Sequence, residues 1–346
     1  FGPGSGRTFA REIVHTFLDE DCSILLLDRH EYSPGDPNRP DLLRVSTVDG
    51  LAKTVLKNPG EVTAWGVDFY GVARFGILSH GDLSGAIYRD SEKAEWRTVL
   101  PLANRKGKLR PLGFDAAGGR IFVAALSPER RWALYPMSTV DGSLGEALLA
   151  DKVYDIVPER FQPSIDGVAL AGPVFSRTKR TLLGVRYFTE SPRVKWFDAD
   201  FVRYQAAVDR ALPDTVNVFV NQSRDGQRQL WLAFSDQHPG AYHLFDLGKR
   251  SFKPLAPRMD HIVPAQMAPM LAIKFQARDG LTIHGYLTVP RGRQPAGLPV
   301  VVMPHGGPWV RDSWGFDPLV QLLANRGYAV LQMNYRGSPG YGDELY

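Results

Sequence analysis

The 346-residue sequence predicts a chain that is mostly β-structure and ends in a shorter part where strands and a helix alternate. Two observations lead to this prediction. Over the first three quarters of the chain, polar landmark residues recur at a nearly regular interval, and each is followed by short apolar segments of strand length. The C-terminal part instead contains an apolar strand, a Gly-rich turn, a helical pattern and a second apolar strand.

Each landmark is an aspartate or a serine that opens a short turn, and all but Ser223 follow an apolar residue. Their spacings are about 49, 47, 61 and 47 residues, at Asp19, Asp68, Asp115, Ser176 and Ser223. Such a period, with several strands in each repeat, is typical of β-propeller blades. An unrelated β-sandwich is the alternative, but the regular spacing favours a propeller with about five visible blades.

The strands expected after the landmarks come in pairs, and some pairs have a third member. They are 23–27 and 42–46, 72–78 and 87–89, 121–126 and 133–137, 182–187 and 194–197, and 230–234 and 242–246, with third strands at 96–100 and 251–255. Residues 8–17 are expected to pair with a segment outside the sequence. Helical spacing of apolar residues, closed by Pro213, predicts a helix at 200–212. A hairpin at 272–289 turns at Asp279-Gly280.

The residues from Leu298 to Pro308 predict a buried strand at 300–303 that runs directly into His305, Gly306, Gly307 and Pro308. Two adjacent glycines allow a sharp turn and leave backbone N–H groups uncovered. At the carboxyl end of a parallel strand, such N–H groups suit a developing negative charge, as in the oxyanion hole of acyl-transfer enzymes. The alternative is an ordinary turn between a strand and a helix.

A helix of about ten residues is expected next, because Asp317 suits the N-cap, Pro318 the first turn, and Gly327 the residue past the end. Another apolar strand at 328–333 follows. Strand, turn, helix and strand together predict a βαβ unit with two parallel strands.

His305-Gly306-Gly307-Pro308, followed after the helix by Asn334-Tyr335-Arg336-Gly337-Ser338 and Gly340-Tyr341-Gly342, resembles the prolyl oligopeptidase family of serine peptidases. The resemblance is strongest to its bacterial acylaminoacyl-peptidase and dipeptidyl-aminopeptidase branch. It covers residues 270 to 346 closely and the upstream chain more loosely. It implies a β-propeller at 1–268, an α/β-hydrolase domain beginning at 269, a Ser-Asp-His triad and a peptide substrate. It implies neither a metal nor an organic cofactor.

The sequence departs from that family in one respect. No Gly-x-Ser-x-Gly nucleophile elbow occurs, and Gly81 to Gly85 places Ser84 one position late. In the family, the elbow and the triad Asp and His lie beyond the Arg-Gly-Ser loop. We therefore expect residues 1–346 to be an inactive internal fragment of a longer peptidase, lacking N-terminal blades and the triad. The strand at 300–303 is expected to lie between the strand at 329–334 and the nucleophile-bearing strand.

The resemblance also assigns roles within 269–346. The N–H of Gly307 is the first choice for an oxyanion donor, Gly306 sets the turn, and His305 orients the loop. Tyr335 and Arg336 are assigned to the substrate cleft, although an ion pair that holds the Gly-rich loop is an equal alternative for Arg336. An esterase or lipase, or a catalytically inactive propeller used for binding, are the alternative functions.

Composition excludes other classes of function. The formal charge of +4 is spread over 41 basic and 37 acidic residues, without a basic run dense enough for nucleic acid. No apolar run approaches the 18 or so residues of a membrane span, and no histidines have metal-site spacing. The single cysteine, Cys22, is expected to be a small buried hydrophobe. Residue 1 is Phe, so cytoplasmic and periplasmic locations both stay open, as does a homo-oligomer.

Overall fold

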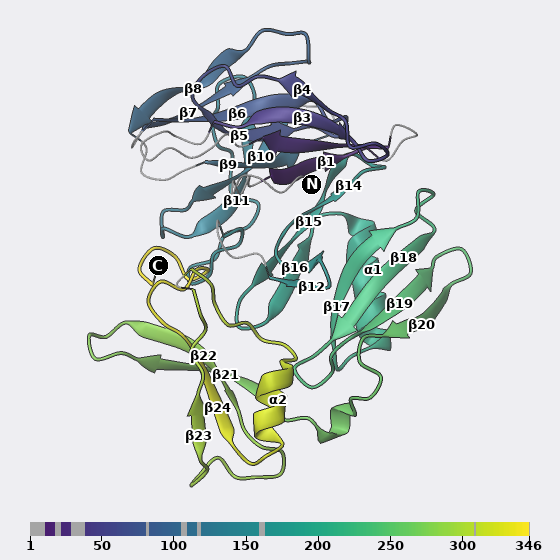
Figure 1. The fold of residues 1–346 in the computed structure, drawn as a ribbon, viewed down its shortest axis with the longest axis vertical. Coiled ribbons are helices and arrows are strands. Elements are labelled where there is room, and N and C mark those ends of the chain that lie inside the picture. The colour runs from purple at the N-terminus through teal and green to yellow at the C-terminus, as the bar shows by residue number, and fades with distance from the viewer. Residues whose placement is uncertain are drawn as a thin grey trace. The chain divides into compact units, whose positions relative to one another are not determined.

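The computed structural model describes residues 11–17, 22–28, 39–80, 83–104, 109–115, 119–158, 163–307 and 309–345. Landmark Asp19 and Pro308 lie outside these ranges. The chain divides into two compact units, each described by itself. Unit 1 comprises residues 1–127, 133–149 and 179–181, and unit 2 comprises 128–132, 150–178 and 182–346. Figure 1 labels their helices and strands.

Unit 1 contains antiparallel sheets whose strands are neighbours in chain order. The first sheet is β1 (Arg11–Thr16), β2 (Ser23–Asp28), β3 (Asp41–Ser46) and β4 (Ala52–Leu56); the second is β5 (Val62–Val67), β6 (Ala73–His80), β7 (Leu83–Tyr88) and β8 (Arg97–Asn104); the third is β9 (Arg110–Phe114), β10 (Arg120–Leu126) and β11 (Trp132–Ser138). For the described residues 11–16, the expectation of a pairing partner outside the sequence is wrong, because β1 pairs with β2.

Buried apolar side chains lie between neighbouring sheets of unit 1. One cluster joins the first sheet to the second through residues such as Leu42 and Trp65. Another joins the second to the third through Phe75, Tyr88 and Ile121. Full burial of one such side chain stabilises the fold by roughly 1.5–3 kcal/mol. Neighbouring sheets are therefore held face to face by their side chains.

Unit 2 continues the antiparallel pattern. It contains the hairpin β12 (Ser164–Ile165) and β13 (Val168–Ala169), the sheet β14 (Gly172–Ser176), β15 (Thr181–Phe188) and β16 (Pro192–Trp196), and the sheet β17 (Val216–Gln222), β18 (Arg228–Phe234), β19 (Ala241–Asp246) and β20 (Ser251–Pro257). Helix α1 (Ala199–Ala211) confirms the helix expected at 200–212. The Asp198 side chain caps its first turn, and Phe201 and Val208 pack between the two sheets with Trp196 and Trp231.

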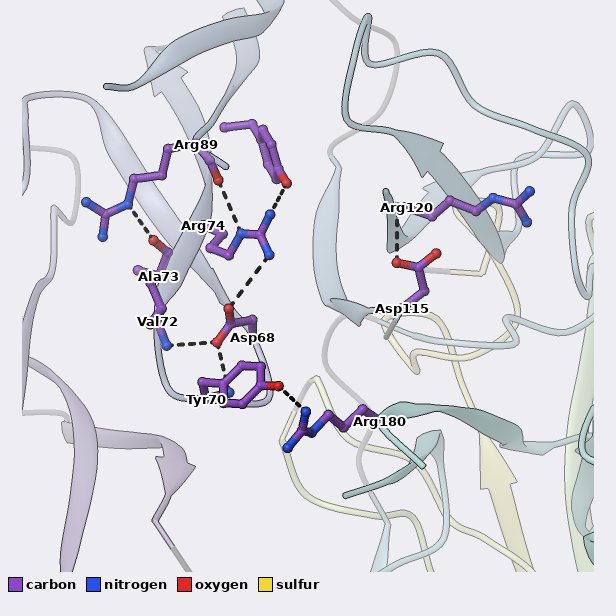
Figure 2. A network of polar contacts seen from close by, with 10 residues as sticks. Asp68, Tyr70, Val72, Ala73, Arg74, Arg89, Asp115, Arg120 and Arg180 are labelled. Carbon is purple, nitrogen blue, oxygen red and sulfur yellow. Dashed lines mark hydrogen bonds and ion pairs between the residues drawn. The ribbon is translucent and has the colours of Figure 1, made fainter. Parts of the chain in front are cut away.

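Asp68, Asp115 and Ser223 stand in the turn between the first and second strands of a sheet, whereas Ser176 is the last residue of β14. Asp68 accepts hydrogen bonds from the N–H groups of Tyr70 and Val72, and Asp115 accepts one from the N–H of Arg120 (Figure 2). Ser223 accepts from the N–H of Arg228 in the same way. The strands expected after the landmarks are confirmed, whereas the strand before each later landmark was missed: β5, β9, β14 and β17.

A mixed sheet follows the short helix η1 (Pro264–Gln266). Its order is β21 (Met270–Gln276), β22 (Thr282–Thr288), β24 (Ala329–Asn334) and β23 (Val300–Val302). Only the β23–β24 pair is parallel. Helix α2 (Pro318–Ala324) connects these two strands and lies alongside β24 (Figure 1). The expected hairpin and the expected parallel pairing are thus confirmed. The predicted burial of the strand at 300–303 is wrong, because Val300 and Val302 on this edge strand are 55% and 54% exposed.

Helix α2 begins and ends as the sequence predicted but is shorter than the expected ten residues. The Asp317 carboxylate accepts hydrogen bonds from the N–H groups of Leu319 and Val320. At the other end, the N–H groups of Gly327 and Tyr328 bond to carbonyls of the last turn, and Gly327 has a φ of 91°. This is a Schellman-type end, for which glycine is the favoured residue. Among the described residues, β23 is an edge strand, and a neighbour on its other side stays a prediction.

The structure also bears on the expected burial of Cys22 and on the expected absence of a membrane span. Cys22 is exposed, not buried, because it lies in the turn before β2 with a φ of 42°. Its carbonyl, rather than its thiol, is used, and accepts hydrogen bonds from the N–H and hydroxyl of Thr47. Within the described residues, no helix is long and apolar enough to cross a membrane.

Candidate functional site

The parallel pairing of β23 and β24 brings two loops to one edge of the sheet. Val300 lies beside Ala329, and Val302 lies beside Leu331. Because parallel strands end at the same edge, the loop after β23 and the loop after β24 leave the sheet together. These are the two segments that the sequence singled out, at residues 303–307 and 335–342.

The two loops are joined through His305. The Tyr335 hydroxyl donates a hydrogen bond to the His305 carbonyl at 2.7 Å, and the two rings stack with centroids 4.2 Å apart. The His305 Nδ1 lies 2.8 Å from the Gly306 carbonyl oxygen, which can only accept, so Nδ1 carries the proton. In the neutral ring, Nε2 then accepts from the fully buried Ser338 hydroxyl at 2.8 Å. Both ring nitrogens are engaged, which favours a positioning role over proton transfer.

Gly307 has a conformation that other residues rarely adopt, with a φ of 135°. A Cβ atom at this position would lie 2.9 Å from the Trp309 backbone nitrogen and 3.1 Å from Val310 Cγ2. Gly306 differs, since a Cβ there would meet nothing within 4 Å. Among the described residues, nothing accepts a hydrogen bond from the exposed Gly307 N–H. This N–H is therefore available to a bound group.

A second contact between the loops runs through the buried side chain of Asn334, at the end of β24. Its Oδ1 accepts from the Asp312 N–H at 2.8 Å, and its Nδ2 donates to the Asp312 carbonyl at 3.2 Å. The same Nδ2 donates to the Tyr341 hydroxyl at 2.8 Å. One amide thereby holds the segment after Gly307 and the Gly-rich loop after β24 at fixed positions.

The Gly-rich loop is also anchored by a buried carboxylate, Asp155. Its Oδ1 accepts from the Trp132 N–H at 2.8 Å, and its Oδ2 accepts from the Gly342 N–H at 3.1 Å. Its own N–H donates to the Gly340 carbonyl. Burial raises the pKa of Asp155, and the two N–H donors act in the opposite direction. Asp155 therefore restrains the loop without contacting the Gly307 turn.

Of the two roles left open for Arg336, the structure contains the ion pair. Its guanidinium bonds to Asp279, in the turn between β21 and β22. A contact of Arg336 or Tyr335 with substrate stays a prediction. The sequence did not identify Ser338, Asn334 and Asp312 as supports of the Gly307 turn. The motif from Asn334 to Ser338 contains two of these residues, whereas Asp312 lies outside it and becomes a neighbour of Asn334 through the path of the loop.

No cluster of three His, Cys, Asp or Glu side chains that could hold a metal ion occurs in the ranges that the structure covers. His284, on β22, is buried and stacks on the Tyr341 ring with centroids 4.4 Å apart. Burial lowers the pKa of His284 to about 4, so the ring is neutral at neutral pH.

Comparison with curated proteins finds peptidases. The chain is 37% identical to dipeptidyl aminopeptidase BIII of Pseudoxanthomonas mexicana over 114 residues, which are 31% of this chain and 16% of that protein. It is 30% identical to dipeptidyl peptidase family member 6 of Caenorhabditis elegans over 190 residues, 49% of this chain and 26% of the relative. The human acylamino-acid-releasing enzyme is 31% identical over 141 residues, 39% of this chain and 16% of that enzyme. No protein-family profile matches the chain.

Solved structures give the same fold. A puromycin-hydrolyzing peptidase of Mycobacterium tuberculosis superposes with a TM-score of 0.59 at 18% identity, covering 93% of this chain and 50% of that one. A structure from a study of two prolyl endopeptidases gives a TM-score of 0.58 at 12% identity, covering 94% and 46%.

This chain is related to the peptidases of the prolyl oligopeptidase family. The predicted resemblance is thereby confirmed. The chain spans about half the length of the superposed peptidases, and its aligned segments span 16% to 26% of the three curated relatives described above. The low identity to the solved structures concerns fold alone.

Proposed function

We propose that the complete protein is a serine peptidase of the prolyl oligopeptidase family that hydrolyses short peptides. In this proposal, residues 1–268 form part of a β-propeller, and residues 269–346 form the opening part of an α/β-hydrolase domain. The observation that carries the proposal is the Gly307 turn. Gly307 is exposed and its N–H has no acceptor among the described residues. The turn follows a parallel strand and is held by His305 and Tyr335 in a chain related to peptidases.

The proposed reaction is acyl transfer through a Ser-Asp-His triad on a part of the protein outside residues 1–346. The serine attacks the peptide carbonyl carbon while the triad histidine takes the hydroxyl proton, and negative charge collects on the carbonyl oxygen. The Gly307 N–H donates to that oxygen together with the N–H that follows the serine. A fixed donor of this kind stabilises the transition state more than the bound substrate.

The substrate is proposed to be a short peptide with either a blocked or a free N-terminus. The curated relatives named above include an acylamino-acid-releasing enzyme and dipeptidyl peptidases, so both classes belong in the test. The propeller would exclude larger proteins from the site, and no cofactor takes part in the proposed reaction.

The deciding experiment measures hydrolysis of N-acetylated, dipeptidyl and prolyl chromogenic peptides by the full-length protein. We expect turnover of at least one class and stoichiometric labelling of one serine outside residues 1–346 by a fluorophosphonate probe. Residues 1–346 alone are the matched control and should stay unlabelled. Hydrolysis of simple esters without any peptide would point to an esterase, and a full-length protein that neither turns over nor labels would overturn the enzymatic proposal.

A further inference from the structure

In the segment after Gly307 and on β24, two buried oxygens have no hydrogen-bond donor among the described residues: Asp312 Oδ2 and Gln332 Oε1. The same two side chains do touch through their other atoms, because Gln332 Nε2 donates to Asp312 Oδ1 at 3.2 Å. Gln332 is only 4% exposed. The Asp312 carboxyl and the Gln332 amide thus share one hydrogen bond, and each group has one further oxygen without a donor among the described residues.

Neither a turned Gln332 amide nor Pro308 supplies the missing donor. Turning the Gln332 amide by half a revolution exchanges its nitrogen and oxygen, and then places an oxygen against Asp312 Oδ1. Pro308 lies outside the described residues, but proline has neither an N–H nor a side-chain donor to offer. A single added proton would satisfy both orphaned oxygens, since an acid O–H donates and an amide oxygen accepts.

We propose that Asp312 is held in its protonated form and shares a reciprocal pair of hydrogen bonds with Gln332. Oδ2–H donates to Gln332 Oε1, while Oδ1 accepts from Gln332 Nε2. The proton comes from solvent, and no other group changes its charge. Each group then uses both of its polar atoms, as buried polar groups in folded proteins generally do.

The surroundings of Asp312 agree with a neutral acid. Burial raises the pKa of the Asp312 carboxyl and outweighs the opposite influence of His305, Gln332 and Arg311, while Asp317 raises it further. Asp155 gives the contrast, since both of its oxygens already accept backbone N–H groups and need no proton.

The pair restrains the segment that follows the Gly307 turn, and its link to catalysis rests on the proposed function. The Asp312 backbone bonds to Asn334 in both directions, and its carbonyl also accepts from Arg311 Nε at 3.2 Å. Asp312 therefore fixes the segment that follows Gly307 against β24. It is a positioning residue for the oxyanion donor and does not touch the reacting atoms.

Infrared spectroscopy of residues 1–346 and of the full-length protein tests the protonation directly. At about pH 6, roughly two units above an ordinary aspartate pKa, we expect the C=O band of a protonated carboxyl. Asp312→Asn should remove the band, and Asp155→Asn, a second buried aspartate, should leave it unchanged. Absence of the band, or its survival in Asp312→Asn, would overturn the proposal.

The pH dependence of unfolding gives a second readout. A carboxyl whose pKa is raised in the folded state binds more protons there than in the unfolded state. Its contribution to stability is fully present below the unfolded pKa of about 3.8 and is lost as pH rises through the folded pKa, by up to about tenfold in the folding constant per pH unit. Asp312→Asn keeps a reciprocal amide pair and should flatten this slope. An unchanged slope would contradict the proposal.

Peptide hydrolysis separates this inference from the proposed function. In the full-length protein, kcat should fall on the alkaline side as Asp312 ionises, with little change in KM, and Asp312→Asn should lose this alkaline limb. Asp312→Leu, which cannot form the pair, should lower kcat by about tenfold. If the infrared band is present but the protein has no peptidase activity, the acid–amide pair is supported and the proposed function is contradicted. If the protein is active but the band is absent, the proposed function is supported and the acid–amide pair is contradicted.

Discussion

The β5–β8 sheet and the C-terminal mixed sheet each depend on an aspartate that joins a loop to a strand, and the two aspartates are satisfied differently. Asp68 accepts two backbone N–H groups through Oδ1, at 2.9 and 3.0 Å, and its Oδ2 faces Arg74 at 3.8 Å (Figure 2). Asp312 has one amide donor at 3.2 Å and a second, buried oxygen without a donor among the described residues. Both carboxylate oxygens of Asp68 therefore have partners, whereas one carboxylate oxygen of Asp312 has no donor among the described residues.

The contrast follows from repetition. The role of Asp68 recurs at Asp115 and Ser223, which accept N–H groups across the equivalent turn of other sheets. A contact that recurs in three sheets indicates a structural role within each sheet. The contacts of Asp312 instead join the segment after Gly307 to Gln332 and Asn334 of β24. We therefore expect changes in the mixed sheet's loops to alter turnover, and changes at the repeated turns to alter stability.

The largest expected effect is that of Gly307→Pro in the full-length protein. Proline deletes the N–H donor, and loss of one oxyanion donor lowers kcat by on the order of 10²–10³, or roughly 3–4 kcal/mol. Proline also fixes φ at about −65°, far from the φ of 135° at Gly307, so the total loss should be at least this large. Steady-state kinetics on the best peptide substrate should show a much larger change in kcat than in KM. Full kcat in a folded Gly307→Pro variant would show that the donor lies elsewhere.

Two alanine variants separate the donor from the conformation. Gly307→Ala keeps the N–H but places Cβ 2.9 Å from the Trp309 nitrogen at a φ of 135°, so it should also lower kcat. Gly306→Ala meets no atom within 4 Å, and its thermal midpoint should equal that of the unmodified protein. A Gly307→Ala variant as active as the unmodified protein would mean that the turn tolerates a side chain.

Asp68→Ala is expected to act on stability alone. It removes both backbone hydrogen bonds of the turn and the acidic partner of Arg74, a loss of about 1–2 kcal/mol by analogy with capping side chains. Chemical denaturation should show a lower midpoint with an unchanged slope. Asp68→Asn keeps an acceptor oxygen and should lose less. A fall in kcat of the folded Asp68→Ala protein would break the proposed division between the two regions.

The sequence located much of the fold because its signals are local. Strands after the landmarks, the Asp317 cap and the Asp279-Gly280 turn depend on residues close together in the chain. The missed strands β9 and β14 contain Pro111 and Pro173, with glycines beside them, which weaken any strand pattern; pairing with a neighbouring strand overrides that weakness.

The site was predicted less completely. His305, Gly306 and Gly307 could be recognised because glycine and histidine form a contiguous pattern. The pairing of Asp312 with Gln332 could not be recognised in the sequence, because twenty positions separate the two residues and their contact depends on the register of β24. Cys22 was misplaced for a similar reason: its apolar neighbours on one side suggested burial, while the backbone turns there.

The smallest expected effect is that of changing Arg336, which is an exception to the rule that changes in the mixed sheet's loops alter turnover. Arg336 belongs to the mixed sheet's loops, yet its partner Asp279 lies in a hairpin turn, and both side chains are more than half exposed. The Leu281 N–H, and then Arg336, lowers the pKa of Asp279, so the pair should persist in mildly acidic solution. Exposed pairs of this kind contribute little to stability.

If Arg336 only tethers the loop, Arg336→Gln and Asp279→Asn should each leave kcat/KM within about twofold of the unmodified protein. A substrate contact predicts otherwise: Arg336→Gln alone would lower kcat/KM by about tenfold or more, because a charged hydrogen bond to substrate would be lost. Measuring both variants and the double variant on the same peptide distinguishes these two roles.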